Sequence, residues 1–248
     1  MATTSVVSAF RVLEGVARLQ PVGLSELARE VELPKSTVQR CLLTLQEVGW
    51  AESSTSAPTR WSMTLRALSV IGGFGARESL RDIAVPVMNE LQLSTTETVH
   101  LAAPDGDVLV LLERLDTSHQ LRAFLPLGAR IPLHASATGL AFLSAWDQAQ
   151  VDRYLGGALE VRTDDTLVDP HDIRAELARI RERGYSINVG GLTTHISSVG
   201  APILDRTGAP VAAVSISGPS TRIEPGRFPD LGAQVASAAA RITQRLRA

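Results

Sequence analysis

Polar and basic side chains recur along residues 34–48, in a stretch whose apolar residues follow a helical spacing. Val38, Leu42 and Leu45 repeat at steps of four and three, which is typical of a helix with one buried face. The opposite face then carries groups that can reach phosphates and base edges. These groups belong to Lys35, Ser36, Thr37, Gln39, Arg40 and Thr44. Such side chains on one helical face predict contact with nucleic acid.

The segments around this helix complete a known DNA-binding arrangement. A first helix is predicted over 5–19 and a second over 24–31, and Glu32 and Leu33 form the turn before Pro34, which suits the first turn of a helix. Two short helices joined this closely indicate a helix-turn-helix. Extended arms at 50–52 and 60–63 around a Ser/Thr/Pro tip predict a β-wing. Arg60 in this wing would enter a minor groove or contact a phosphate; the alternative is a solvated wing residue.

Composition limits the class of protein. Of the residues, 44% are hydrophobic and 20% are charged, and the net charge is −2, as expected of a globular protein that does not coat nucleic acid along its length. We expect neither a secretory signal nor a transmembrane helix. The single cysteine, Cys41, is compatible with a reducing cytoplasm, where we expect the protein to reside.

A glycine cluster at 72–75 is the predicted boundary between two domains, after a short helix over 65–71. A further helix over 77–91 contains Pro86, which should kink or split it. This helix has an apolar stripe, which we expect to support dimer contacts or to dock the two domains together; the alternative is that the stripe packs on its own domain. The stripe consists of Leu80, Ile83, Val87 and Leu91.

Beyond residue 94 the pattern changes to strands mixed with helices. Strands are predicted over 98–102, 108–112, 120–125, 186–189, 197–204 and 211–217, and helices over about 136–146, 148–156, 170–183 and 227–246. Gly106 lies in the first hairpin turn, where a positive φ is expected. Helices on an antiparallel sheet give an α+β domain.

One group of small and polar residues suggests ligand binding in this second domain. Residues 133–139 form a small-residue turn that opens an apolar helix, so backbone N–H groups there could bind an anion; ordinary capping by Ser136 is the alternative. Ser215 and Ser217 share one face of a buried strand, where their hydroxyls need partners. A ligand carboxylate would satisfy both regions. No catalytic motif occurs, and the five histidines lack metal-ligand spacing, so we predict neither an enzyme nor a metal or cofactor site.

With these motifs in order, the chain resembles the isocitrate-lyase-regulator (IclR) family of bacterial transcription factors over essentially its whole length. The resemblance is carried by four segments: LSELAREVELPKSTVQRCLLTLQEVGW, GARIPLHASATG, RGYSINVGG and SSVGAPILDRTGAPVAAVSISGP. It implies a winged helix-turn-helix over 1–72, a linker helix over 73–93 and a GAF-like effector domain over 94–248. It also implies binding of double-stranded operator DNA as a dimer or tetramer, modulated by a small organic acid, with repression and activation both open.

By the same resemblance, the recognition helix spans 34–48 and an effector pocket lies in the second domain. Its implied lining is Gln120, Ala123, Ile131, Ala137, Thr138, Asn188, Ser198, Ser215 and Ser217. Strand alternation places Arg122 on the same face as Gln120, so Arg122 would join the lining if it turns inward. Leu140, Asn188 and Ser198 depart from the lysine, acidic residue and cysteine that relatives often carry at these positions, and the small Ala123 suggests a roomier pocket. We therefore expect an aromatic acid; the alternative is that Phe124 or Leu121 fills the space and the ligand is a short aliphatic acid. The competing functions are a winged-helix interaction protein and a metabolite-binding enzyme.

Overall fold

The computed structural model describes residues 2–71 and 75–247 and divides into two compact units, residues 1–75 and 76–248. The predicted flexible glycine cluster falls mostly on residues 72–74, outside the described residues. Of the helices in the described ranges, none has the length and apolarity needed to cross a membrane. Each unit has a hydrophobic core of its own, and each is described separately below.

The first unit is the predicted winged helix-turn-helix. Val38, Leu42 and Leu45 are buried with apolar residues of the two preceding helices, which fixes the recognition helix by its apolar face. The wing strands pair antiparallel. The elements are α1 (Thr4–Leu19), α2 (Leu24–Glu30), α3 (Lys35–Glu47), β1 (Ala51–Ser53), β2 (Trp61–Met63) and α4 (Arg66–Ile71).

The second unit begins with the long helix α5 (Gly75–Thr95), which runs through Pro86 without being split. Leu80, Val87 and Leu91 are buried against strands and the last helix of the same unit, and Ile83 packs beside them. The expectation that this stripe serves dimer contacts or domain docking is therefore wrong. The alternative holds: the stripe forms part of the core of its own domain.

Antiparallel strands make up the sheet of the second unit, in the order β5-β4-β3-β8-β7-β6. Gly106, in the turn between β3 and β4, has a φ of +65°, as predicted. The predicted strand over 120–125 is absent, and this segment is irregular. The physical reason is that a side chain, and not a backbone ladder, attaches the segment to β4: the Arg114 guanidinium donates a hydrogen bond to the carbonyl of Leu125, and β4 pairs on this side with β5 at Val108–Val110. The strands are β3 (Thr98–Asp105), β4 (Val108–Leu115), β5 (Arg130–Pro132), β6 (Ser186–Val189), β7 (Ile196–Leu204) and β8 (Pro210–Pro219).

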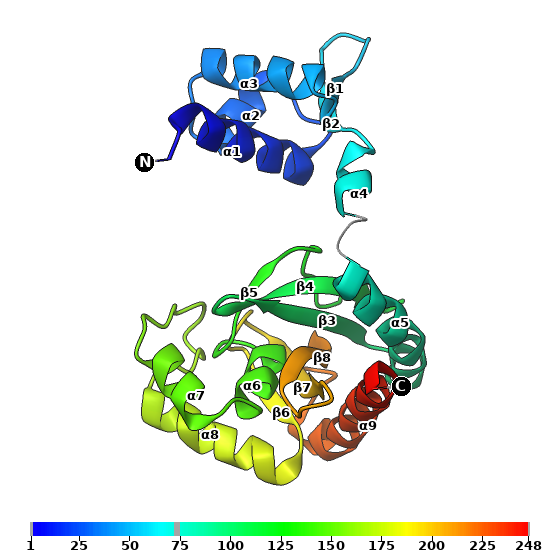
Figure 1. Ribbon diagram of the computed structural model, residues 1–248. Helices are drawn as coiled ribbons and strands as arrows, with labels where there is room; N and C mark the ends of the chain where they lie inside the picture. Colours follow the sequence, from blue (N-terminus) through cyan, green and yellow to red (C-terminus); the bar gives the residue numbers. More distant parts are fainter. Residues whose placement is uncertain (1, 72–74, 248) are drawn as a thin grey trace. The chain divides into compact units, whose positions relative to one another are not determined.

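Helices cover both faces of this sheet (Figure 1). On one face, α5 and α9 (Phe228–Arg247) pack against Val99, Leu101 and Val214. On the other, α6 (Ala137–Ser144) and α8 (Pro170–Arg183) pack over Ala102 and Ala213, with α7 (Gln148–Leu155) beside them. A short 3-10 helix, η1 (Pro225–Arg227), precedes α9. The alternation of β3 thus places even-numbered residues on the α6 side.

We expect Leu91→Ala to lower the free energy of unfolding by about 2–4 kcal/mol, because the truncation leaves a cavity in the core. Leu93→Ala on the same helix is the matched control and should cost less than about 0.5 kcal/mol. The two side chains are 5% and 75% exposed, respectively. Urea denaturation of the full chain, followed by circular dichroism, measures both. Equal losses would mean that the α5 stripe is not a core element.

Candidate functional site

The polar face of α3 is open to solvent. Lys35, Ser36, Gln39, Arg40 and Thr44 are all exposed. Thr37 is half-buried. The two positive charges and the amide of Gln39 are therefore free to approach the edge of a DNA groove, where such groups bind phosphates and bases.

Arg60, at the base of the wing, has partners within its own unit. Its guanidinium lies 3.2 Å from the carboxylate of Glu26 and donates a 3.4 Å hydrogen bond to the carbonyl of Pro21. About half of the Arg60 side chain is exposed. Exposed ion pairs contribute at most about 1 kcal/mol, so this pair holds Arg60 on the surface without preventing an exchange for a phosphate.

The second candidate site is a polar area on the face of the sheet beneath α6. The strand register aligns two rows across β6, β7, β8 and β3, because residues directly opposite each other in antiparallel strands share a face. The first row is Ser186, Gly200, Ser215 and His100, and the second is Asn188, Ser198, Ser217 and Thr98. All but Ser198, which is half-buried, are buried. Polar side chains at such depth need hydrogen-bond partners.

A small cavity of about 50 Å³ opens on these rows. Four of the residues assigned to the pocket from the sequence line it: Ala123, Asn188, Ser198 and Ser217. The remaining lining residues come from β3, from the start of β7 and from two irregular segments: His100, Ile196, Phe124, Leu125, Leu192 and Thr193. The predicted roominess is therefore not present, because Phe124 and Leu125 stand beside the small Ala123.

Two other predicted pocket residues lie away from the cavity. Gln120 and Arg122 are exposed, and the Arg122 guanidinium lies 3.9 Å from the Asp116 carboxylate. The expectation that they share an inward strand face is wrong because residues 120–125 form no strand. Ile131 is buried in the apolar core farther along the same side of the sheet.

The start of α6 lies close to the polar rows. Ser186 Oγ donates a 2.6 Å hydrogen bond to the carbonyl of Ala137, beside Gly200. Ser136 Oγ caps the helix by accepting from the Gly139 amide at 3.0 Å, so the ordinary capping role is confirmed. Among the hydrogen bonds of the described residues, none engages the amides of Ala137 or Thr138. Ala137, Thr138 and Ser215 are buried here but do not line the cavity.

His100 is a cavity residue that sequence reasoning missed. Its side chain is 3% exposed, and Nδ1 lies 3.2 Å from Ser217 Oγ. Nε2 has no hydrogen-bond partner among the described residues. Burial lowers the pKa of His100 to about 4; the charge of Arg114 acts in the same direction and Asp116 opposes it. The imidazole is therefore neutral at pH 7. The period-two pattern of β3, with apolar Val99 and Leu101 on either side, could have placed His100 on the ligand side.

Arg114 is the second residue that the sequence reasoning missed. It lies opposite His100 in the sheet and pairs with Asp116 at 2.8 Å. Its guanidinium stacks on the Phe124 ring at 4.2 Å and donates a hydrogen bond to the carbonyl of Leu125. Arg114 thus anchors the irregular segment that forms one wall of the cavity.

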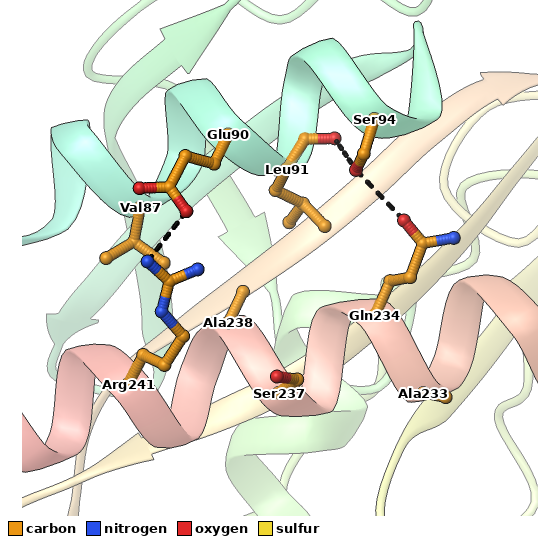
Figure 2. A pocket seen from close by; sticks show the side chains of 9 residues that line it. All are labelled: Val87, Glu90, Leu91, Ser94, Ala233, Gln234, Ser237, Ala238 and Arg241. Carbon is orange, nitrogen blue, oxygen red and sulfur yellow. Dashed lines mark hydrogen bonds and ion pairs between the residues drawn. The ribbon is translucent and has the colours of Figure 1, made fainter.

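A larger groove of about 410 Å³ lies on the opposite face, between α5 and α9 (Figure 2). The figure shows two bridges across it: Glu90 pairs with Arg241 at 2.7 Å, and Ser94 Oγ donates to Gln234 Oε1 at 2.9 Å. Its charged groups thus satisfy each other. An exposed cluster of Asp169, His171 and Asp172 is explained by helix capping, since Asp169 accepts from the amides of the other two. The cavity at His100 is therefore the better ligand site.

We expect His100 to make the protein less stable in acid. Its folded pKa of about 4 lies below the ordinary 6.5, so the unfolded chain binds a proton more readily between these values. Stability from the neutral imidazole is complete above about pH 6.5 and is lost as the pH falls toward 4. Between pH 7 and pH 4.5, the wild type should lose about 2 kcal/mol of its free energy of unfolding through His100. His100→Gln should lack this part of the acid destabilisation. Urea titrations at both pH values measure it.

The exposed His171→Gln is the control and should leave the pH dependence unchanged. An acid dependence identical in wild type and His100→Gln would show that His100 is not held neutral by burial.

Comparison with known proteins covers both units. Residues 5–54 match the model of the IclR helix-turn-helix domain, and residues 76–244 match that of the bacterial transcriptional regulator IclR C-terminal domain. The chain is 32% identical to the transcriptional repressor IclR of Escherichia coli over 96% of its length and 88% of the relative's.

Two solved structures share the fold. The IclR of Thermotoga maritima has a TM-score of 0.81 at 27% identity, and the match covers 98% of each chain. An IclR homolog from Microbacterium hydrocarbonoxydans, in complex with 4-hydroxybenzoate, has a TM-score of 0.81 at 26% identity, with 98% of each chain covered. The exposed helix of the first unit, the sheet of the second and these matches agree, and the chain belongs to the IclR family of DNA-binding bacterial transcriptional regulators.

Proposed function

We propose that this protein is a sequence-specific regulator whose binding to operator DNA is modulated by a small aromatic acid, and that it controls a catabolic operon. The observation that carries the proposal is the exposed polar face of α3, in a chain whose second unit contains a buried polar cavity. We assign operator binding to residues 1–72, a linker helix to 73–93 and effector binding to 94–248. No catalytic step is proposed.

One recognition helix per chain supplies too few base contacts for high specificity, so we propose a symmetric oligomer on two half-sites, as a dimer or a dimer of dimers. In this arrangement Lys35 and Arg40 bind phosphates or guanines, and Gln39 reads a base edge. Ser36, Thr37 and Thr44 add hydroxyl contacts, and Arg60 supplies a contact from the wing.

For the effector, we propose that its carboxylate binds the amides at the start of α6 together with nearby hydroxyl groups. Neutral donors suit this site because the second unit contains no lysine and Arg122 faces solvent. The hydroxyl donors are those of Ser198 and Ser215, with Asn188 beside them. Ser217, whose hydroxyl is hydrogen-bonded to His100 Nδ1, lines the same site. Together with the helix dipole, such donors stabilise a buried carboxylate.

An aromatic acid requires more room than about 50 Å³. The cavity would widen by movement of the irregular segments that carry Phe124 and Leu192. The strands on its other side are held by the hydrogen bonds of the sheet. The ring would lie against Ala123 and Phe124. The 4-hydroxybenzoate complex of the Microbacterium relative supports this ligand class.

We expect Lys35→Ala and Arg40→Ala each to weaken operator binding, because each removes a positive charge at the phosphates. The slope of log K against log salt should become shallower by about 0.9 for each phosphate that is no longer neutralised. Fluorescence anisotropy with the protein's own upstream DNA measures both. Arg206→Ala, which removes the same charge from an exposed turn of the second unit, is the control. Unchanged affinity and slope in both α3 variants would exclude α3 as the reading helix.

We expect benzoate to bind more tightly than pyruvate or glyoxylate, because the ring fills apolar space that the short acids leave. Ser198→Ala should weaken benzoate binding by about threefold to tenfold through the loss of one hydrogen bond. Ser197→Ala is the matched control: it is the preceding residue on β7, faces the other side of the strand and bonds Ser220. Calorimetry measures each affinity.

Tighter binding of pyruvate or glyoxylate than of benzoate would contradict the aromatic assignment. Equal affinities of the two serine variants would instead remove Ser198 from the effector site while leaving the ligand class intact.

A further inference from the structure

Two polar atoms on β3 lack hydrogen-bond partners within the part of the chain that the structure describes: Thr98 Oγ1 and His100 Nε2. Both side chains are at least 97% buried, and they lie two residues apart on the α6 side of the sheet. A buried donor or acceptor without a partner is unfavourable, because the hydrogen bond that it made to water is not replaced. His100 also lines the cavity. A buried ring nitrogen without a hydrogen-bond partner, at the wall of a cavity, indicates that an atom of a bound ligand completes its hydrogen bond.

The contact with Ser217 determines which ring nitrogen of the neutral His100 carries the hydrogen. Among the described residues, His100 Nδ1 is the one hydrogen-bond partner of the Ser217 hydroxyl, at 3.2 Å. A buried hydroxyl hydrogen needs an acceptor, and the lone pair of a neutral Nδ1 provides one. The imidazole hydrogen is then on Nε2. His100 therefore presents a donor to the cavity, and a ligand oxygen is its natural partner.

The charges around His100 determine what kind of oxygen this is. Arg114, the nearest cation, is already paired with Asp116 and with the carbonyl of Leu125. A carboxylate placed at His100 would meet only the neutral donors of His100 and Thr98, and burying a charge with so little compensation is costly. An uncharged hydroxyl or carbonyl oxygen has no such penalty.

The carboxylate site proposed above lies farther along the same row. Gly200, beneath the start of α6, and His100 are separated by β8 alone, with Ser215 between them. Two strand spacings place their Cα atoms about 9–10 Å apart. One aromatic ring with polar groups at opposite ends spans the space between such anchors.

We propose that His100 is a specificity-determining residue of the effector site, whose Nε2–H donates a hydrogen bond to a hydroxyl or carbonyl oxygen opposite the carboxylate of an aromatic acid. This rests on the proposed function and narrows the effector to acids that carry a second, uncharged oxygen. A simple benzoate leaves His100 Nε2 without a partner.

The test compares 4-hydroxybenzoate with benzoate by calorimetry in wild type, His100→Leu, His100→Gln and the exposed control His171→Leu. Wild type should bind 4-hydroxybenzoate about fivefold to tenfold more tightly than benzoate. His100→Leu should reduce this ratio to about one, since the donor is lost. His100→Gln, whose amide can accept from Ser217 and donate to the ligand, should retain a preference, and the control should match wild type.

If His100→Leu does not fold, nitrogen NMR of the wild-type imidazole provides the same test. The Nε2 resonance, identified by its absence in His100→Gln, should shift when 4-hydroxybenzoate is added and not when benzoate is added. A preference that persists in His100→Leu, or a resonance that does not respond to bound 4-hydroxybenzoate, would overturn the role of His100 and leave the aromatic effector in place. Failure of both acids to bind wild type would overturn the aromatic effector and the role of His100 together.

Discussion

The close packing of α6 on β7 is the constraint on which the candidate ligand site depends. A Cβ on Gly200 would lie 2.9 Å from the backbone of Ala137, and one on Gly139 would lie 2.2 Å from the carbonyl oxygen of Leu133. Both are contacts with backbone, which cannot rotate away as a side chain can. Gly200 allows the start of α6 to lie directly on β7, where the 2.6 Å hydrogen bond from Ser186 holds it, and Gly139 allows the helix to pack against the turn that precedes it. The helix amides are thereby brought to the polar rows.

The register of the sheet explains why those rows exist at all. His100, Ser215 and Gly200 come from distant parts of the sequence and become neighbours because β3, β8 and β7 are adjacent and antiparallel. The intervening residues on the same strands, such as Val99 and Val214, face α5 and α9 and form a continuous apolar core. The apolar face of the sheet thus stabilises the fold. Part of the other face can therefore carry buried polar groups, although these lower the free energy of unfolding.

Local patterns in the sequence were sufficient for most elements. The apolar spacing of α3 and α9 and the Gly106 hairpin predicted the corresponding helices and turn, because these depend on contacts close in sequence. The segment 120–125 was predicted wrongly as a strand, since its alternation resembles one and the sequence does not show that the Arg114 side chain, and not a neighbouring strand, attaches it to β4. The α5 stripe was assigned to an interface because an apolar helix face does not reveal which surface buries it.

The candidate site was harder to predict for the same reason. Ser198 and Ser217 were identified through alternation and family resemblance, whereas the place of His100 beside Ser215 depends on the pairing of β3 with β8, more than a hundred residues apart in sequence. Arg114 lies opposite His100 in the local β3–β4 pairing, but its role depends on that position of His100. Gln120 was placed in the pocket by family resemblance, and Arg122 was added through alternation along a strand that does not form. Side chains positioned by pairing between distant strands become visible only when the sheet order is known.

The same sheet order places β3 between the cavity and α5. His100 faces the cavity, while Val99 and Leu101, on either side of it, pack in the core that contains Val87 and Leu91 of α5. An effector can change operator affinity only by binding two states of the protein with different free energies. A ligand bonded to His100 would favour the position of β3 that suits the bond, and α5 is the element packed on the reverse of that strand. α5 is also the first element of the second unit in chain order, so the strand that carries His100 packs on the helix nearest in sequence to the first unit.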